Sequence, residues 1–298
     1  MNSHTPAFFS EYLALINTAL KSYIKEFSYS DVRLADSIQY STLLGGKRIR
    51  PILTLATAEC VGSTRDSALP FACALEFIHA YSLIHDDLPA MDNDALRRGQ
   101  ATCHIAFNEA TAILAGDALQ AMAFELISNK SQLPAHKTLR TMQILSRASG
   151  ARGMVYGQAL DFESVGKALD ILTLEKMHRH KTGELIEACV IIGALTSQTD
   201  ILESELSAFK KYAQAIGLAF QVQDDILDII SDTATLGKKQ GADEALNKPT
   251  YPALLGLEGA KSKLYGLHDE ALNSLNELNR FSTSKLAQIS HFIIERVR

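Results

Sequence analysis

The sequence predicts an all-α protein. Long segments rich in Ala, Leu, Ile, Glu and Lys dominate the chain, and runs with the alternating pattern of strands are scarce. Within these segments, apolar residues recur every three or four positions, which is the spacing of one face of a helix. Some segments, such as 188–195, are apolar on most faces, as expected for helices at the centre of a bundle.

The first predicted helix covers 7–26, where Phe8, Tyr12 and Ile16 follow helical spacing. The others cover 31–44, 51–61, 67–88, 109–129, 135–151, 170–196, 201–230, 250–278 and 283–296. Prolines near probable first turns, where a missing N–H costs little, support several of these starts: Pro51, Pro70, Pro134 and Pro252. The most loop-like region is 231–252, which is polar and contains glycine.

The chain of 298 residues is long enough to bury a substantial core. It contains no internal repeat, low-complexity tract or long linker, so we expect a single domain over 1–298. The composition, 47% hydrophobic and 21% charged, is that of an ordinary globular protein. A net charge of −5 gives no electrostatic reason to bind nucleic acid, which favours a basic face.

Features of membrane or secreted proteins are also missing from the pattern. The most apolar stretch, 188–197, is about half the length that a membrane span requires. The N-terminal residues have no basic region before their apolar residues and include Glu11, so we expect no signal peptide. The four cysteines stand singly, which is typical of reduced thiols. We therefore expect a cytoplasmic protein without a membrane span.

Two acidic clusters stand out. The first lies in HDDLPAMDNDALRRG (85–99), where Pro89 should end or bend the preceding helix. The second lies in QVQDDILD, where Asp224 and Asp228 are four apart and share one helix face. Both are flanked by apolar residues, and buried ionised carboxylates need cations or hydrogen-bond partners. The candidate metal ligands are Asp86, Asp87, Asp92, Asp224, Asp225 and Asp228.

These clusters favour magnesium bound together with a diphosphate. Oxygen ligands without nearby Cys or paired His suit Mg²⁺, which is usually shared between one or two carboxylates and substrate phosphates. Arginine holds phosphate oxygens through two hydrogen bonds, and Arg97 and Arg98 follow the first cluster at once. Further candidate anion-binding residues stand beside glycines: Lys47, Arg48 and Arg50 in GGKRIRP, Lys181 in HKTGEL, and Lys238 in LGKKQ. GGKR lacks the spacing of a P-loop.

A competing interpretation is a di-iron helical bundle. Such a protein uses two Glu-x-x-His pairs and two further glutamates, and the chain has Glu76–His79 and Glu175–His178. This alternative leaves both aspartate clusters and the basic residues unexplained.

The motifs together resemble the trans (E-type) isoprenyl diphosphate synthases, and among them the bacterial members that make the C15 product farnesyl diphosphate. GGKRIRP, EFIHAYSLIHDDLPAMDNDALRRG, ILAGDAL, GQALDF, KTGELI and GLAFQVQDDILDIISDTATLGK occur in the family's order. The resemblance covers essentially the whole chain. It implies an all-α bundle of roughly ten or more helices around a deep central cavity, usually as a homodimer.

The resemblance also implies roles for individual residues. Asp86 and Asp92 would ligate two Mg²⁺ ions and Asp224 a third, with Asp87, Asp225 and Asp228 supporting them, and Mn²⁺ could substitute. The allylic diphosphate, dimethylallyl or geranyl, would be held by Arg97, Lys181 and Lys238. Isopentenyl diphosphate would occupy a separate basic pocket formed by Lys47, Arg50, His79 and Arg98. Thr182 and Gln221 would direct oxygens at the developing carbocation. The loop 231–250 is the candidate lid.

Product length is expected to depend on the helix before Asp86. Tyr81 and Ser82 lie five and four residues before Asp86, about 6–8 Å along that helix. An aromatic residue there could form a floor that stops chain growth, and bacterial C15 synthases similarly combine one aromatic at this place with the two-residue insertion that contains Pro89. The alternative is that Tyr81 is an ordinary core residue.

Some alternatives and one departure remain. A geranyl or geranylgeranyl diphosphate synthase would differ only in product length. A terpene cyclase typically replaces the second D-D-x-x-D and would not need Lys47 and Arg50, whereas a non-catalytic subunit would be expected to have lost some aspartates. Asn93 interrupts a run that is often all acidic in similar proteins, and we expect little effect on metal binding.

Overall fold

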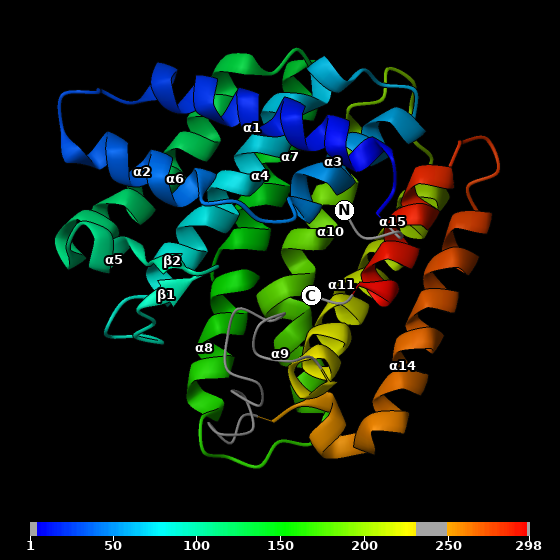
Figure 1. The fold of residues 1–298 in the computed structure, drawn as a ribbon. Coiled ribbons are helices and arrows are strands. Elements are labelled where there is room, and N and C mark those ends of the chain that lie inside the picture. The colour runs from blue at the N-terminus through cyan, green and yellow to red at the C-terminus, as the bar shows by residue number, and fades with distance from the viewer. Residues whose placement is uncertain (1–4, 231–248, 297–298) are drawn as a thin grey trace. The chain divides into compact units, whose positions relative to one another are not determined.

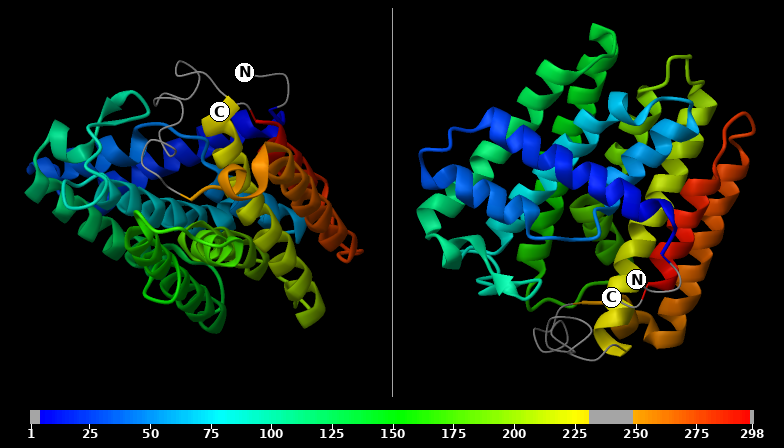
Figure 2. Two further views of the ribbon diagram at one scale, coloured as in Figure 1. Left: turned by 90° about the horizontal axis from the view of Figure 1, so that it is seen from below. Right: turned by 45° about the horizontal axis from the view of Figure 1, so that its top comes forward.

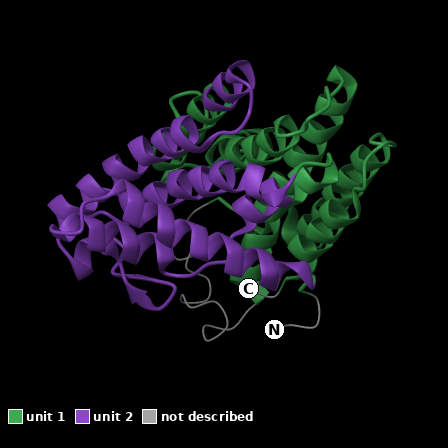
Figure 3. Cartoon of the chain, turned by 90° about the horizontal axis from the view of Figure 1, so that it is seen from above, with its two compact units in different colours: residues 1–6, 56–63, 143–298 green, residues 7–55, 64–142 purple. Residues whose placement is uncertain are grey.

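The computed structural model describes residues 5–230 and 249–296. Within these residues the regular elements are helices apart from one short hairpin, which confirms the predicted all-α class. The chain divides into two compact units (Figure 3). Unit 2 covers 7–55 and 64–142, and unit 1 covers 1–6, 56–63 and 143–298. The expectation of a single domain over 1–298 stays a prediction.

Unit 2 is built around α4 (Arg65–Asp86). Thr64 caps its start by accepting a hydrogen bond from the N–H of Ser67 at 3.2 Å, and the helix ends three residues before Pro89. Phe71, Leu75 and Phe77 are fully buried, and α4 packs along α6 (Figure 1). The other elements of this unit are α1 (Phe8–Phe27), α2 (Arg33–Leu43), β1 (Leu96–Arg97), β2 (Gln100–Ala101), α5 (Cys103–Ala106) and α6 (Glu109–Lys130).

Unit 1 is centred on the long helix α11 (Glu203–Ile230), which packs against α10 (Glu184–Leu195) and α14 (Tyr251–Asn276). Figures 1 and 2 show α15 (Ser284–Glu295) beside α14, as their contacts require. The remaining elements are α8 (Met154–Ser164), α9 (Ile171–His178) and the π-helix η1 (Arg179–Gly183). Helices α3 (Ile49–Cys60) and α7 (Ala135–Ser149) contribute residues to both units.

Several sequence-based boundaries were wrong. The periodicity missed α8 and the hairpin β1–β2, whose strands of two residues are too short to show an alternating pattern. The predicted helix 170–196 is three consecutive elements, α9, η1 and α10. Pro70 lies in the second turn of α4 rather than the first. In α14 the helix is broken at Gly256, which has a φ of 70° that favours glycine.

The four cysteines and most of the apolar segment 188–195 are buried in the structure. Helix α10 is buried along most of its length, as predicted for 188–195. Helices α4 and α6 are long and apolar enough to span a membrane, but 78% of the apolar window of α4 is buried inside the protein, as in the core helix of a globular protein. The corresponding share for α6 is 44%. All four cysteines, Cys60, Cys73, Cys103 and Cys189, are free thiols and buried.

Candidate active site

The first aspartate segment is a turn at the end of α4. The N–H of Asp92 donates to the carbonyl of Asp86 at 2.9 Å, so the two outer acids of the D-D-x4-D spacing are brought together by the backbone. The N–H of Asn93 closes the same turn on Leu88, and Asn93 has a φ of 53°. Asn tolerates this left-handed conformation better than most residues, which gives the departure from an all-acidic run a conformational reason.

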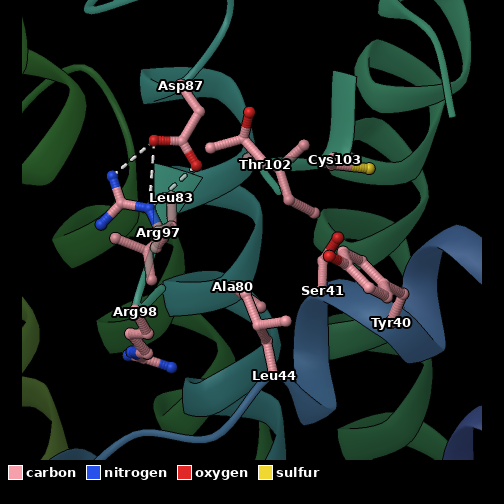
Figure 4. A pocket seen from close by; sticks show the side chains of 11 residues that line it. Tyr40, Ser41, Leu44, Ala80, Leu83, Asp87, Arg97, Arg98, Thr102 and Cys103 are labelled. Atoms are coloured by element: carbon pink, nitrogen blue, oxygen red, sulfur yellow. Dashed lines mark hydrogen bonds and ion pairs between the residues drawn. The ribbon is translucent and has the colours of Figure 1, made fainter. Parts of the chain in front are cut away.

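The middle acid of this segment is committed to a protein partner. Asp87 is buried, and its two carboxylate oxygens accept three hydrogen bonds from Nε and Nη2 of Arg97 at 2.6–3.0 Å (Figure 4). Arg97 lies on β1, one residue before the two-residue turn of the hairpin. The predicted role of Arg97 in binding the allylic diphosphate stays a prediction.

A small cavity lies beside this ion pair (Figure 4). Its walls include Tyr40, Leu44, Ala80, Asp87 and Cys103, and its volume is about 20 Å³. A cavity of this size has room for about one water molecule. It therefore does not accommodate a prenyl chain.

His79 lies on α4, the helix that ends at the first aspartate segment, and a cluster of basic side chains surrounds it. Nη1 of Arg50 is 3.4 Å from Nε2 of His79. Burial, followed by the charges of Arg50 and Arg98, lowers the pKa of His79 well below its ordinary value of 6.5. The ring is therefore neutral at pH 7, and Nε2 accepts because arginine can only donate.

Arg98 belongs to the same cluster. Its Nη1 donates to the carbonyl of Gly45, and a Cβ on Gly46 would lie 2.6–2.7 Å from three guanidinium atoms. Gly46 also has a φ of 118°, a conformation that favours glycine. Lys47 is half-buried on the same loop. The structure thus brings Arg50, His79 and Arg98 together, as the sequence suggested, and places Lys47 next to the glycine pair.

Arg48 differs from its neighbours. It is buried, and Nη1 donates to Oε1 of Glu76 at 2.6 Å, Nη2 to the carbonyl of Thr42 at 2.7 Å and Nε to Asn17 at 3.2 Å. The interpretation of Arg48 as an anion-binding residue was therefore wrong. It is the counter-charge of a buried glutamate inside unit 2.

The same contacts remove the di-iron alternative. Glu76 holds Arg48, and Glu175, the acid of the other Glu-x-x-His pair, lies 2.6 Å from Nζ of Lys263. His178 is buried and stacked on Tyr251 with ring centroids 5.8 Å apart. Burial lowers the pKa of His178 to about 4.

The second aspartate segment stays helical. Asp224, with a side chain 44% exposed, lies 2.6 Å from Nη2 of Arg296, which is itself 3% exposed. The same guanidinium donates to the carbonyl of Phe220 at 2.8 Å and covers its ring at 4.0 Å. Arg296 was not among the predicted residues, because no local pattern links it to a motif more than seventy positions away.

Asp225 and Asp228 complete this segment. Asp225 is buried and accepts the N–H of Tyr251, the first residue of α14, at 2.8 Å. Asp228 lies one turn further along α11 and is half-buried. The second acid of the D-D pair thus has a buried protein partner here too.

Lys181 and Thr182 lie on the π-helix η1. Short π-helical segments are frequent at functional sites because they shift side chains relative to an α-helix. Nζ of Lys181 is 2.5 Å from Oδ2 of Asp161 in the GQALDF motif. A Cβ on Gly157 of that motif would lie 2.0 Å from the backbone N of Lys181, so glycine permits the close approach of α8. Thr182 is buried, and Gln221 on α11 is half-buried.

The candidate floor residues lie on α4. Tyr81 is 5% exposed, and burial, with a smaller effect of Asp86, raises the pKa of its hydroxyl to about 12. The hydroxyl of Ser82 donates to the carbonyl of His79 at 2.9 Å. Lys238 and most of the candidate lid lie outside the described residues.

The acids that could hold a metal are all oxygen donors. Among the described residues, no group of three or more His, Cys, Asp or Glu side chains is arranged to hold an ion. Magnesium does not require such a cage, because it usually takes one or two protein carboxylates and completes its shell with water and phosphate oxygens. The half-buried Asp86 and the exposed Asp92 fit that chemistry.

Comparison with known proteins identifies the family of this chain. Residues 31–283 match the model of the polyprenyl synthetase family, and the chain belongs to this family. It is 51% identical over 284 residues to the farnesyl diphosphate synthase of Escherichia coli, covering 94% of this chain and 95% of that one. It is also 47% identical over 263 residues to the geranylgeranyl diphosphate synthase of Cyanophora paradoxa, covering 88% and 87%.

The fold comparison gives the same result. The crystal structure of a geranyltransferase from Legionella pneumophila aligns with a TM-score of 0.84 and 35% identity, covering 96% of this chain and 94% of that one. The all-α class is therefore that of a family with solved members.

Proposed function

We propose that this protein is a prenyltransferase that joins isopentenyl diphosphate head-to-tail to dimethylallyl or geranyl diphosphate and makes farnesyl diphosphate (C15). One structural observation carries the proposal. Helix α4 bears His79 within the arginine cluster and Asp86 at the aspartate turn, seven residues later. Seven residues of helix span about 10 Å, which separates a basic anion pocket from a carboxylate site on one rigid element.

The roles follow from these surroundings. Asp86, Asp92 and Asp224 would hold Mg²⁺, supported by Asp87, Asp225 and Asp228. When bound, the ions would neutralise charge on the allylic diphosphate as it leaves. We assign three ions to the site, with Mn²⁺ as a substitute, and assign Arg97, Lys181 and Lys238 to the same diphosphate.

The chain's own cations serve the second substrate. Arg50 and Arg98 place fixed positive charge beside a neutral His79. A diphosphate would accept hydrogen bonds from these guanidinium groups, with Lys47 as a further donor. Isopentenyl diphosphate held there would present its double bond to the allylic carbon.

The reaction then needs three events. The allylic C–O bond breaks, the isopentenyl double bond attacks C1 of the cation, and a proton is lost to the departing diphosphate. Thr182 and Gln221 would direct oxygens at the cation, and the surrounding apolar side chains would exclude water. Tyr81 and Ser82 would form the floor that ends growth at C15.

Assembly and location are proposed with the same function. Ile113 and Leu114 of α6 are exposed apolar residues, which supports a homodimer. We propose a cytoplasmic enzyme without nucleic-acid partners or a membrane span. The nearest alternative is a synthase of C10 or C20 product, and a relative at 47% identity is named a geranylgeranyl diphosphate synthase.

The test is incubation with Mg²⁺, isopentenyl diphosphate and each allylic primer in turn. The products are dephosphorylated and the alcohols identified by chain length. Farnesol as the main alcohol supports the proposal, and geraniol or geranylgeraniol would assign another member of the family. Absence of any condensation product would contradict the function.

A further inference from the structure

The motif ILAGDAL lies on α6, outside both aspartate segments and the arginine cluster, and its glycine, Gly116, is buried against α4. Glycine inside a helix costs about 1 kcal/mol relative to alanine, so a buried helical glycine needs a packing reason. Among helical glycines the contrast is Gly266 on α14, where a Cβ would meet nothing within 4 Å.

The reason at Gly116 is the ring of His85. A Cβ on Gly116 would lie 2.1 Å from Nε2, 2.4 Å from Cδ2 and 2.8 Å from Cε1 of that ring. Nε2 is also 3.1 Å from the carbonyl of Ile113, one turn earlier on α6. A carbonyl only accepts, so Nε2 carries the hydrogen. The Nε2 edge of the imidazole is thus held against α6 by a hydrogen bond, in the space left by the missing side chain.

His85 also contacts the ring of Tyr81. Tyr81 and His85 are four apart on α4 and share a helix face. Their rings meet edge to face, with centroids 5.8 Å apart and an interplanar angle of 75°. The contacts therefore run without a break from Gly116 through His85 to the ring proposed as the floor.

This chain of contacts can hold the floor in place. Tyr81 has no hydrogen bond from its hydroxyl among those described, and a buried ring without one is oriented by its packing. His85 supplies one wall of that packing and is itself immobilised by α6. If the imidazole moved, the Tyr81 ring could leave its position. His85 and Gly116 would then affect the floor without being floor residues themselves.

We infer that Gly116 and His85 are positioning residues for product length, which form a seat that holds the Tyr81 ring across the path of the growing prenyl chain. This inference rests on the proposed function and deepens it. The seat restricts the product to C15 by fixing an aromatic ring, so its loss lengthens the product even while Tyr81 remains.

The experiment compares product distributions of the full-length protein and its variants with geranyl diphosphate, isopentenyl diphosphate and Mg²⁺. His85→Ala and Gly116→Ala should each raise the C20 to C15 ratio about fivefold or more, the effect of losing one edge-on ring contact. Gly116→Ala should also lower the melting temperature, because its methyl group overlaps the imidazole. Combining both changes makes room for the methyl group, so it should restore stability and keep the longer products.

Controls separate this inference from the function itself. Tyr81→Ala should lengthen the product, and adding His85→Ala to it should change the ratio no further, because no ring is left to hold. Gly266→Ala should retain the C15 product. A ratio unchanged in His85→Ala, or a further rise when it is added to Tyr81→Ala, would overturn the seat. Absence of product from the unmodified protein would instead overturn the proposed function, and the seat's role with it.

Discussion

In the first aspartate segment the second carboxylate of the pair, Asp87, is buried and holds Arg97, and in the second segment Asp225 is buried and holds the N–H of Tyr251. The first acids of the two pairs, Asp86 and Asp224, are more exposed. In both segments the first acid is thus the outer, more exposed one, and the second is the inner acid, buried against the protein. Of the two outer acids, Asp224 also pairs with Arg296.

The two segments differ in how far their partners lie along the chain. Asp87 and Arg97 are 10 residues apart, whereas Asp225 and Tyr251 are 26 apart. The first segment is a turn closed by its own backbone, and the second is a straight stretch of α11. The first can form locally, while the second is complete only after α14 has docked.

The largest expected effect tests the outer acids. Asp86→Ala should lower turnover about a thousandfold, because a metal ligand stabilises the leaving diphosphate by several kcal/mol. Stability should change little, since Asp86 lies at the end of its helix. Steady-state kinetics and urea unfolding measure the two quantities. Asp31→Ala, at an exposed turn, is the control. Equal activity of the Asp86 and Asp31 variants would contradict the role of Asp86 as a metal ligand.

The inner acids should instead affect stability. Asp87→Ala leaves the mostly buried guanidinium of Arg97 without its carboxylate, and should lower the free energy of unfolding by about 3 kcal/mol. Asp225→Ala removes one hydrogen bond to a backbone N–H and should cost about 1–2 kcal/mol. Urea unfolding of both variants measures the difference. A larger loss in Asp225→Ala would reverse the comparison.

Acid should destabilise the protein through a buried histidine. The pKa of His178 is about 4 in the folded protein and 6.5 in its ordinary state, so the unfolded chain binds the proton first. The stabilisation is complete above pH 6.5 and is lost as the pH falls toward 4. Between pH 7.5 and 5 it should decrease by about 2 kcal/mol.

Comparison with His178→Phe isolates this effect. Phenylalanine keeps a ring to stack on Tyr251 but does not titrate. The variant should therefore lose about 2 kcal/mol less than the unmodified protein over the same pH range in urea unfolding. Parallel pH profiles would assign the acid sensitivity to other groups.

The smallest effect concerns the first turn. Asn93 has a φ of 53°, so Asn93→Ala should cost about 1 kcal/mol and Asn93→Gly close to nothing. Thermal or urea unfolding resolves this difference. If alanine and glycine are equivalent, the left-handed conformation does not explain the asparagine.

The sequence predicted the class of fold and most helices because periodicity is local. It also predicted that Arg50, His79 and Arg98 serve one site, and they lie together. It failed where the determinant is distant or conformational. Arg296 reaches Asp224 across the tertiary fold, and the backbone of Lys181 in the π-helix lies close to Gly157 of another helix. The role of Arg48 was predicted wrongly, because the residues next to an arginine in the sequence do not show whether its side chain is buried.

The buried cysteines have a practical consequence. Burial raises the pKa of Cys60 to about 12, and raises those of Cys73 and Cys103 as well. A thiol reacts with alkylating and maleimide reagents as the thiolate, so these native sulfurs should react slowly while the protein is folded. A single cysteine introduced on the surface would then be the fastest-labelling position, and a fluorophore or spin label could be attached without first removing the native thiols.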